Sequence, residues 1–125
     1  MRIMKIKRFE EIEAWQEARK LTNLVYKLSS KDRFSKDWGL KDQIQRASVS
    51  IMNNISEGFD SGTKPEFIKF LNYAKRSASE VQCNLYIALD QGYIEKENFD
   101  GLYDHSEKIR RMISSFIKYL REGTR

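Results

Sequence analysis

The chain is poor in the residues that build disulfides, metal sites and tight turns: it has one cysteine, one histidine, one proline and six glycines. Cys83 cannot form an intrachain disulfide, and it stands close to Val81 and Leu85, so we expect a small structural side chain within a helix. The single His105 lies in a highly charged segment, so we expect a surface histidine and neither a catalytic base nor a metal ligand. So few glycines and prolines also argue against a turn-rich β fold.

The sequence also lacks an apolar run that approaches the roughly 18 residues needed to span a bilayer. Its N-terminus is basic and has no apolar signal core, so we expect a cytoplasmic protein with no membrane partner. A carboxylate metal site would have to use residues such as Glu57 and Glu80. Di-metal helical bundles pair such glutamates with Glu-x-x-His motifs, and the sequence has none. We therefore predict no metal, no cofactor and no enzymatic activity.

What the sequence has in quantity is charge. It has 23 lysines and arginines against 18 aspartates and glutamates, which gives a net charge of +5 and a pI of about 9.3. This modest excess allows an anionic partner such as RNA, DNA or an acidic protein surface, but does not require one. With 40% apolar residues, the chain suits a single helical domain, residues 1–125, that can bury a core.

Apolar residues recur every three or four positions along most of the chain, which predicts amphipathic helices. The clearest seam steps from Phe67 to Ala88 without a break, and a second contains Ile44, Ile51 and Ile55. We expect helices from about Glu10 to Ser29, from the N-cap Ser35 to Phe59, from the N-cap Thr63 to Asp90 or Gln91, and a fourth that contains Phe99 and Leu120. Because short connections join them, we predict an all-α, antiparallel up-down-up-down four-helix bundle.

The third helix has the clearest local signals. Thr63 is followed three residues later by Glu66, which is the pattern of a capping box, and Pro65 is tolerated in a first helical turn. Gly92 is expected directly after the end of this helix, at the C′ position. Phe34 lies in the polar loop 29–36 before the second helix, and we expect its side chain to pack against the end of the bundle.

A polar stripe runs beside the apolar seams of the second and third helices. Its members are Gln43, Arg46, Ser50, Asn54, Glu57, Ser77 and Glu80. One interpretation is a buried or interfacial hydrogen-bond network that fixes helix register or subunit orientation, because an unpaired buried polar group costs about 1–3 kcal/mol. The other is a ligand or nucleotide pocket. We favour the structural interpretation. An assembly interface explains the stripe as well as a pocket does, so the stripe does not by itself indicate a ligand.

Basic residues concentrate at the two ends of the chain, in the N-terminal arm of residues 1–8 and from Lys108 onward. The candidate nucleic-acid-binding residues are Arg2, Lys5, Lys7, Arg8, Lys108, Arg110, Arg111, Lys118 and Arg121. We expect the cations of the last helix to point outward, and a solvated helix face is the alternative interpretation. Trp15, Tyr73 and Phe116 are expected in the core, so any binding should be electrostatic and weakly sequence-specific.

Several of these segments together resemble a known family. They are Phe9-x-x-Ile12-x-x-Trp15-x-x-Ala18, Val25-Tyr26, Gln43-Ile44-x-Arg46-Ala47-x-x-Ser50-Ile51-x-x-Asn54-Ile55-Ser56-Glu57-Gly58, Glu66-Phe67-x-x-Phe70-Leu71-x-x-Ala74-x-x-Ser77-Ala78-x-Glu80, and Gly92-Tyr93-Ile94. Over nearly its whole length the chain resembles the four-helix-bundle proteins encoded in intervening sequences of bacterial 23S ribosomal RNA genes. Arg76 departs from the pattern, which usually has a glycine before the serine.

The resemblance implies an all-α bundle that assembles into a ring, a homopentamer, with no known enzymatic activity. One branch of the family looks like the accessory protein of diversity-generating retroelements, a basic pentameric barrel that works with a reverse transcriptase and its RNA. Two functions therefore stand side by side. The first is a ring-forming scaffold that binds RNA or DNA electrostatically. The second is a protein–protein adaptor, for example an accessory subunit of a reverse transcriptase, without direct nucleic-acid contact.

Overall fold

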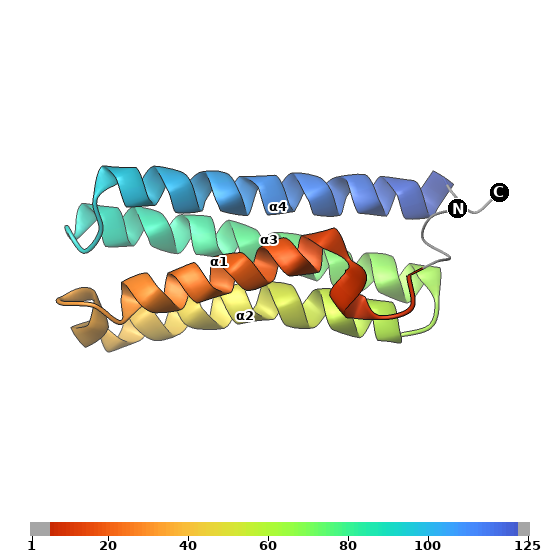
Figure 1. The fold of residues 1–125 in the computed structure, drawn as a ribbon, viewed down its shortest axis with the longest axis horizontal. Coiled ribbons are helices and arrows are strands. Elements are labelled where there is room, and N and C mark those ends of the chain that lie inside the picture. Colours follow the sequence, from red (N-terminus) through yellow and green to blue (C-terminus); the bar gives the residue numbers. More distant parts are fainter. Residues whose placement is uncertain (1–5, 123–125) are drawn as a thin grey trace.

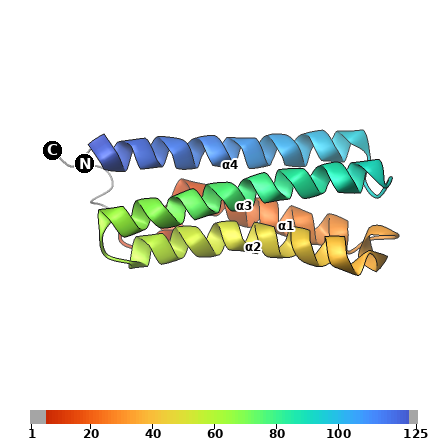
Figure 2. The ribbon, with the colours of Figure 1, turned by 180° about the vertical axis from the view of Figure 1, so that it is seen from behind.

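The computed structural model describes residues 6–122, which form four α-helices, two short 3₁₀ helices and no strand. The helices are α1 (Glu13–Ser29), α2 (Trp38–Asp60), α3 (Lys64–Asp90) and α4 (Lys96–Glu122), with η2 (Phe9–Glu11) and η3 (Phe34–Lys36) as the 3₁₀ turns. This confirms the prediction of an all-α fold with four helices. The helices lie side by side, and short turns join them at alternate ends of the molecule (Figures 1 and 2). None of the helices within residues 6–122 combines the length and apolar character that a membrane span needs.

The helix starts correct two predictions and confirm one. α1 begins at Glu13 because residues 9–11 form the separate turn η2. α2 is capped by Asp37, whose carboxylate accepts a hydrogen bond from the Leu40 N–H at 3.1 Å. The predicted cap Ser35 lies inside η3, and its hydroxyl donates to the Asp32 carbonyl, before that turn, at 2.6 Å. Thr63 caps α3 as predicted and accepts from a backbone N–H at 3.3 Å.

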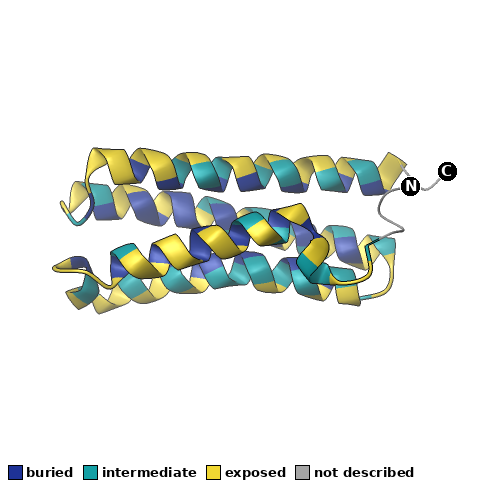
Figure 3. Ribbon diagram, viewed as in Figure 1, coloured by how far each residue is buried: buried dark blue, intermediate teal, exposed yellow. Residues whose placement is uncertain are grey.

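The apolar seams meet in one core. Seven of the α3 residues predicted to face inward are buried: Phe67, Leu71, Ala74, Ala78, Val81, Leu85 and Ala88. Figure 3 shows the buried faces of the helices turned toward one another and the exposed faces turned outward. Tyr73 was expected in the core but is exposed, and Cys83, expected to be a structural side chain, is exposed as well. Cys83 is two residues from both Val81 and Leu85, and a two-residue step turns a side chain to the opposite side of a helix.

Gly58 allows α2 and α3 to approach closely beside the turn that joins them. A Cβ atom at this position would lie 2.8 Å from the Phe67 ring and 2.9 Å from the Phe70 Cβ, which is closer than real contacts allow. Phe67 also meets the Phe59 ring, with the two centroids 6.1 Å apart. The end of α2 and the start of α3 are therefore packed in direct contact.

The opposite end of the bundle is closed by a clasp, defined here as Arg33, Phe34, Asp37 and Tyr93. The Arg33 guanidinium donates to the Gln91 carbonyl at 3.0 Å and lies over the Tyr93 ring at 5.4 Å. Phe34 stacks on the same ring and is buried, as predicted, while the Tyr93 hydroxyl donates to Asp37 at 3.0 Å. Gly92 has a φ of 76°, the left-handed conformation expected of a C′ glycine. The clasp ties the α1–α2 connection to the α3–α4 connection.

Candidate functional site

The cations predicted in the N-terminal arm are placed only in part. Arg2 and Lys5 lie outside the described residues. Lys7 and Arg8 are exposed, and Arg8 pairs with Glu10 at 3.3 Å on the protein surface. The backbone N–H of Lys7 donates to the Glu11 carboxylate at 3.1 Å, which holds the start of the described chain against η2. Of these two cations, only the Lys7 ammonium has no carboxylate partner among residues 6–122.

The cations in the middle of α4 are engaged by a carboxylate of the same helix. Glu107 pairs with Arg110 at 3.0 Å and with Arg111 at 3.8 Å, and it accepts a hydrogen bond from Gln82 of α3 at 3.0 Å. The Gln82 and Arg110 hydrogen bonds hold the pKa of the Glu107 carboxyl below its usual range. Only 32% of the Arg110 side chain is exposed, so the prediction that Arg110 points outward is wrong. Gln82, Glu107, Arg110 and Arg111 are called the Glu107 cluster below.

A second carboxylate, Glu17 of α1, faces the turn of α4 that contains His105 and Lys108. It contacts His105 Nε2 at 2.9 Å, Lys20 at 3.2 Å and Lys108 at 3.8 Å. The His105 side chain is only 14% exposed, so the expectation of a surface histidine is wrong. Its contact with Glu17 is the main cause that lowers the pKa of the Glu17 carboxyl. Lys108 is therefore also opposed by a negative charge.

The last turns of α4 present a different environment. Lys118 and Arg121 are exposed, and together with Lys75 of α3 they line a groove of about 410 Å³. No carboxylate of residues 6–122 forms an ion pair with any of these three cations. The remaining lining residues are Asn72, Ser114, Ile117 and Glu122. We call this hollow the α3–α4 groove.

Sequence reasoning selected Lys118 and Arg121 but missed Lys75. A signal for it existed, because Lys75 directly follows the seam residue Ala74 and therefore borders whichever helix packs beside α3. What the sequence could not supply is the identity of that neighbour. The structure brings Lys75 to the end of α4, about forty positions later in the chain.

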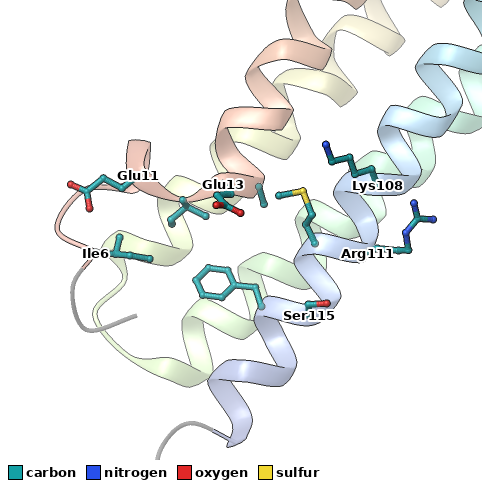
Figure 4. A pocket seen from close by; sticks show the side chains of 10 residues that line it. Ile6, Glu11, Glu13, Lys108, Arg111 and Ser115 are labelled. Atoms are coloured by element: carbon teal, nitrogen blue, oxygen red, sulfur yellow. The ribbon is translucent and has the colours of Figure 1, made fainter. Parts of the chain in front are cut away.

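A larger groove of about 610 Å³ lies between the start of α1 and the middle of α4 (Figure 4). Its apolar lining includes Ile6 and the partly buried Phe116. Lys108 and Arg111 stand on its α4 side, whereas Glu11 and Glu13 stand on the side of η2 and α1. The two positive and two negative side chains cancel, so this α1–α4 groove is apolar and formally neutral.

The polar stripe of α2 and α3 is only partly joined within one chain. The Ser77 hydroxyl of α3 donates to the Ser50 hydroxyl of α2 at 2.9 Å, and the Asn54 amide donates to the same Ser50 oxygen at 3.0 Å. The other four members of the stripe are exposed: Gln43, Arg46, Glu57 and Glu80. Arg46 pairs with Asp42 of its own helix at 2.9 Å. Within residues 6–122, no group of three histidine, cysteine or acidic side chains is placed to hold a metal ion.

Exposed aromatic side chains are the feature that sequence reasoning missed most clearly. Trp38 is 81% exposed in the first turn of α2, and Tyr26 and Tyr86 are also exposed. On α3, the Arg76 guanidinium lies 5.6 Å from the centroid of the exposed Tyr73 ring. Trp38 could have been identified from its position, because it precedes Leu40, where the buried seam of α2 begins. These side chains leave apolar surface on the outside of the bundle.

Comparisons with known proteins agree with this architecture. The model of the family described as 23S rRNA-intervening sequence protein matches residues 10–115. A crystal structure of a protein with unknown function from the S23 ribosomal protein family, from Bacteroides thetaiotaomicron VPI-5482, is similar in fold with a TM-score of 0.77. The two chains are 25% identical, and the similarity covers 84% of this chain and 98% of that one. No curated protein matches the chain.

Proposed function

The chain belongs to the 23S rRNA-intervening sequence protein family, and from this premise we propose that it is a non-enzymatic, ring-forming scaffold that binds RNA or DNA. The binding is electrostatic and has low sequence specificity. The observation that carries the proposal is the pair Lys118 and Arg121, exposed cations that no carboxylate of residues 6–122 neutralises. Phosphates supply the missing negative charge, and their neutralisation releases counterions. The family is named for an intervening sequence of an RNA, which supports an RNA partner in the cytoplasm.

The proposed subunit is an antiparallel up-down-up-down bundle. Three contacts between helices support this direction of the chain. Phe59 near the end of α2 meets Phe67 near the start of α3, and Phe67 in turn meets Phe116 near the end of α4. Tyr86 near the end of α3 contacts Phe99 near the start of α4, with centroids 4.9 Å apart. Each contact joins an early part of one helix to a late part of its neighbour.

The proposed assembly is a homopentameric ring. The exposed Tyr73 and Ile87 of α3 support self-association, because they leave apolar surface on the outside of this helix. The Ser50–Asn54–Ser77 hydrogen bonds lie between α2 and α3, where the rest of the polar stripe can meet a second copy. The number five is what the family resemblance implies. Five copies at +5 each carry a charge of +25, which strengthens attraction to phosphates.

Light scattering coupled to size-exclusion chromatography tests the assembly. Five chains of 14.8 kDa give an expected mass of 74 kDa, the product of the two numbers. Replacing Asn54 or Glu80 with alanine should shift this mass or lower the melting temperature if the polar stripe is an interface. A stable monomer at micromolar concentration would contradict the ring and the charge argument that depends on it.

Fluorescence anisotropy with RNA and DNA oligonucleotides of unrelated sequence tests the binding. We expect similar affinities for all sequences, and the logarithm of the binding constant should fall linearly with the logarithm of the salt concentration. A strong preference for one sequence would contradict electrostatic binding. Absence of binding even at about 50 mM salt would overturn the proposed function.

A second function, the protein–protein adaptor without nucleic-acid contact, is favoured by a different observation. Trp38 is 81% exposed, and large exposed aromatic side chains are typical anchors of protein interfaces. An accessory subunit of a reverse transcriptase is one example of such an adaptor. In that case nucleic acid does not bind to the isolated protein, and Trp38→Ala weakens the complex with the protein partner without changing the fold.

A further inference from the structure

We propose that the α3–α4 groove is a phosphate-binding site, in which Lys75, Lys118 and Arg121 hold the charge of the anion. This inference deepens the proposed function, and it rests on that function for its statement that the phosphate belongs to a nucleic-acid backbone. The chemistry recognised is that of the phosphate group itself. A phosphodiester of RNA or DNA and a free phosphate ion both present it, and the experiment below separates these two sources.

The charge of the groove is the first reason. Three cations and one carboxylate, Glu122, line it, which leaves a formal charge of +2. None of the three cations has an ion-pair partner in residues 6–122, although nine ion pairs occur elsewhere in that part of the chain. Like charges from two helices are therefore held around one hollow, and an oxyanion that enters it relieves their repulsion.

The hydrogen-bonding groups of the groove are the second reason. The Ser114 hydroxyl is exposed and makes no hydrogen bond with another side chain or backbone group of residues 6–122. The Asn72 amide donates to the Ile68 carbonyl at 3.2 Å, which uses only one of its two N–H protons. Both groups can donate to a phosphate oxygen. The buried Ile117 forms the apolar part of the lining, so a bound phosphate meets positive charge and hydrogen-bond donors.

A comparison with the α1–α4 groove is the third reason to place the phosphate in the α3–α4 groove. The α1–α4 groove is larger, but Glu11 and Glu13 balance the charge of Lys108 and Arg111. Moreover, Lys108 contacts Glu17 and Arg111 contacts Glu107, so a phosphate would compete with carboxylates already in place. Of these two grooves within residues 6–122, the α3–α4 groove is the one that combines a net positive charge with unpaired cations.

The central experiment compares two double variants with the same change in charge. Lys118→Glu with Arg121→Glu changes the groove, whereas Lys27→Glu with Lys31→Glu changes two cations at the far end of α1 and its loop. Those two lysines are also exposed and have no ion pair within residues 6–122, so the control matches in charge and exposure. We expect the groove variant to bind RNA about tenfold more weakly than the control variant and to lose about two units of salt slope.

The second measurement follows the backbone amide and side-chain signals by NMR while sodium phosphate is added at constant ionic strength, with chloride as the reference. We expect the signals of Lys75, Ser114, Lys118 and Arg121 to shift and those of Lys27 to stay in place. Ser114→Glu puts a carboxylate into the groove without removing a cation, and it should abolish the shifts. This single variant keeps the test valid if the double reversal disturbs the fold, which circular dichroism would report.

The outcomes separate the inference from the proposed function. Equal loss of RNA affinity in both double variants, or phosphate shifts that lie elsewhere, overturns the inference and leaves electrostatic RNA binding intact. Phosphate shifts in the groove without RNA binding at low salt support the inference, make free phosphate the source, and overturn the proposed function. Absence of both phosphate shifts and RNA binding overturns both.

Discussion

Two groups of cations follow each other on α4 and differ in what faces them. Lys108, Arg110 and Arg111 lie within 4 Å of Glu17 or Glu107. Lys118 and Arg121, two to three turns later, face Lys75 of α3 across a groove. The same residue types on the same helix are thus paired with carboxylates in one place and unpaired in the other. The difference teaches that the place of a carboxylate, on the same helix for Arg110 and Arg111 and on α1 for Lys108, decides whether a cation is available to a partner.

The largest effect is expected from breaking the paired group. Glu107→Ala removes the shorter of the two hydrogen bonds of the Gln82 amide and the partner of Arg110, whose Nε atom is buried and already without a hydrogen bond. We expect the free energy of unfolding to fall by about 2 kcal/mol, since partly buried polar groups are left unsatisfied. Urea denaturation measures this change. The variant should also bind RNA more tightly, because Arg110 and Arg111 then become available.

Glu122→Ala is the matched control on the same helix. Glu122 is exposed and has no ion pair within residues 6–122, so its removal should change the free energy of unfolding by less than about 0.5 kcal/mol. If both alanine variants have the same stability, the Glu107 cluster contributes nothing and the two groups of cations do not differ as described.

A smaller effect is expected from replacing one cation of each group, Arg110 or Arg121, with alanine. Arg110→Ala removes a hydrogen bond to a charged group and the packing of a mostly buried stem, so we expect it to lower the free energy of unfolding by about 1 kcal/mol. Arg121→Ala should leave stability nearly unchanged but weaken RNA binding. Denaturation and anisotropy on the same two variants give both numbers. A loss of RNA affinity in Arg110→Ala as large as in Arg121→Ala would contradict the assignment of the two roles.

The smallest effect concerns pH. The pKa values of Glu17 and Glu107 are both lowered from 4.5, by contacts with His105 for the first and with Gln82 and Arg110 for the second. Carboxyls with lowered pKa values stabilise the fold above pH 4.5, and this contribution is lost as the pH falls through their folded-state values. Between pH 6 and 3, the melting temperature of the double variant Glu17→Gln, Glu107→Gln should therefore fall less than that of the unchanged protein. Both groups are partly exposed, so we expect less than about 1 kcal/mol in total.

The sequence was sufficient for the features that depend on local periodicity. The seam from Phe67 to Ala88 and the cap at Thr63 could be predicted, because they depend on residues within three or four positions of one another. The cap of α2 could not, since Ser35 and Asp37 are both acceptable caps and the choice depended on the turn η3. The periodicity of apolar residues therefore predicts the helices and their buried faces, but it does not predict the end of every helix.

The site depended on contacts that the sequence does not reveal. Arg110 was assigned to an outward face by its helical position, whereas its partner Glu107 on the same helix also accepts a hydrogen bond from Gln82 of α3. His105 was assigned to the surface because its own segment is charged, whereas its partner Glu17 is 88 positions away. Lys75 was missed for the same reason. Side chains at the edges of a helix take their roles from whichever helix packs beside them.

The clasp at one end of the bundle has a consequence for the rate at which the folded protein unfolds. Arg33 and the Gln91 carbonyl are 58 residues apart, so their contact requires that the α1–α2 and α3–α4 hairpins have already met. We predict that this contact forms after the rate-limiting step of folding, so that Arg33→Ala speeds unfolding and leaves the folding rate unchanged, which stopped-flow kinetics can measure. On this prediction, the clasp lengthens the lifetime of the native state and does not change the speed with which the helices assemble.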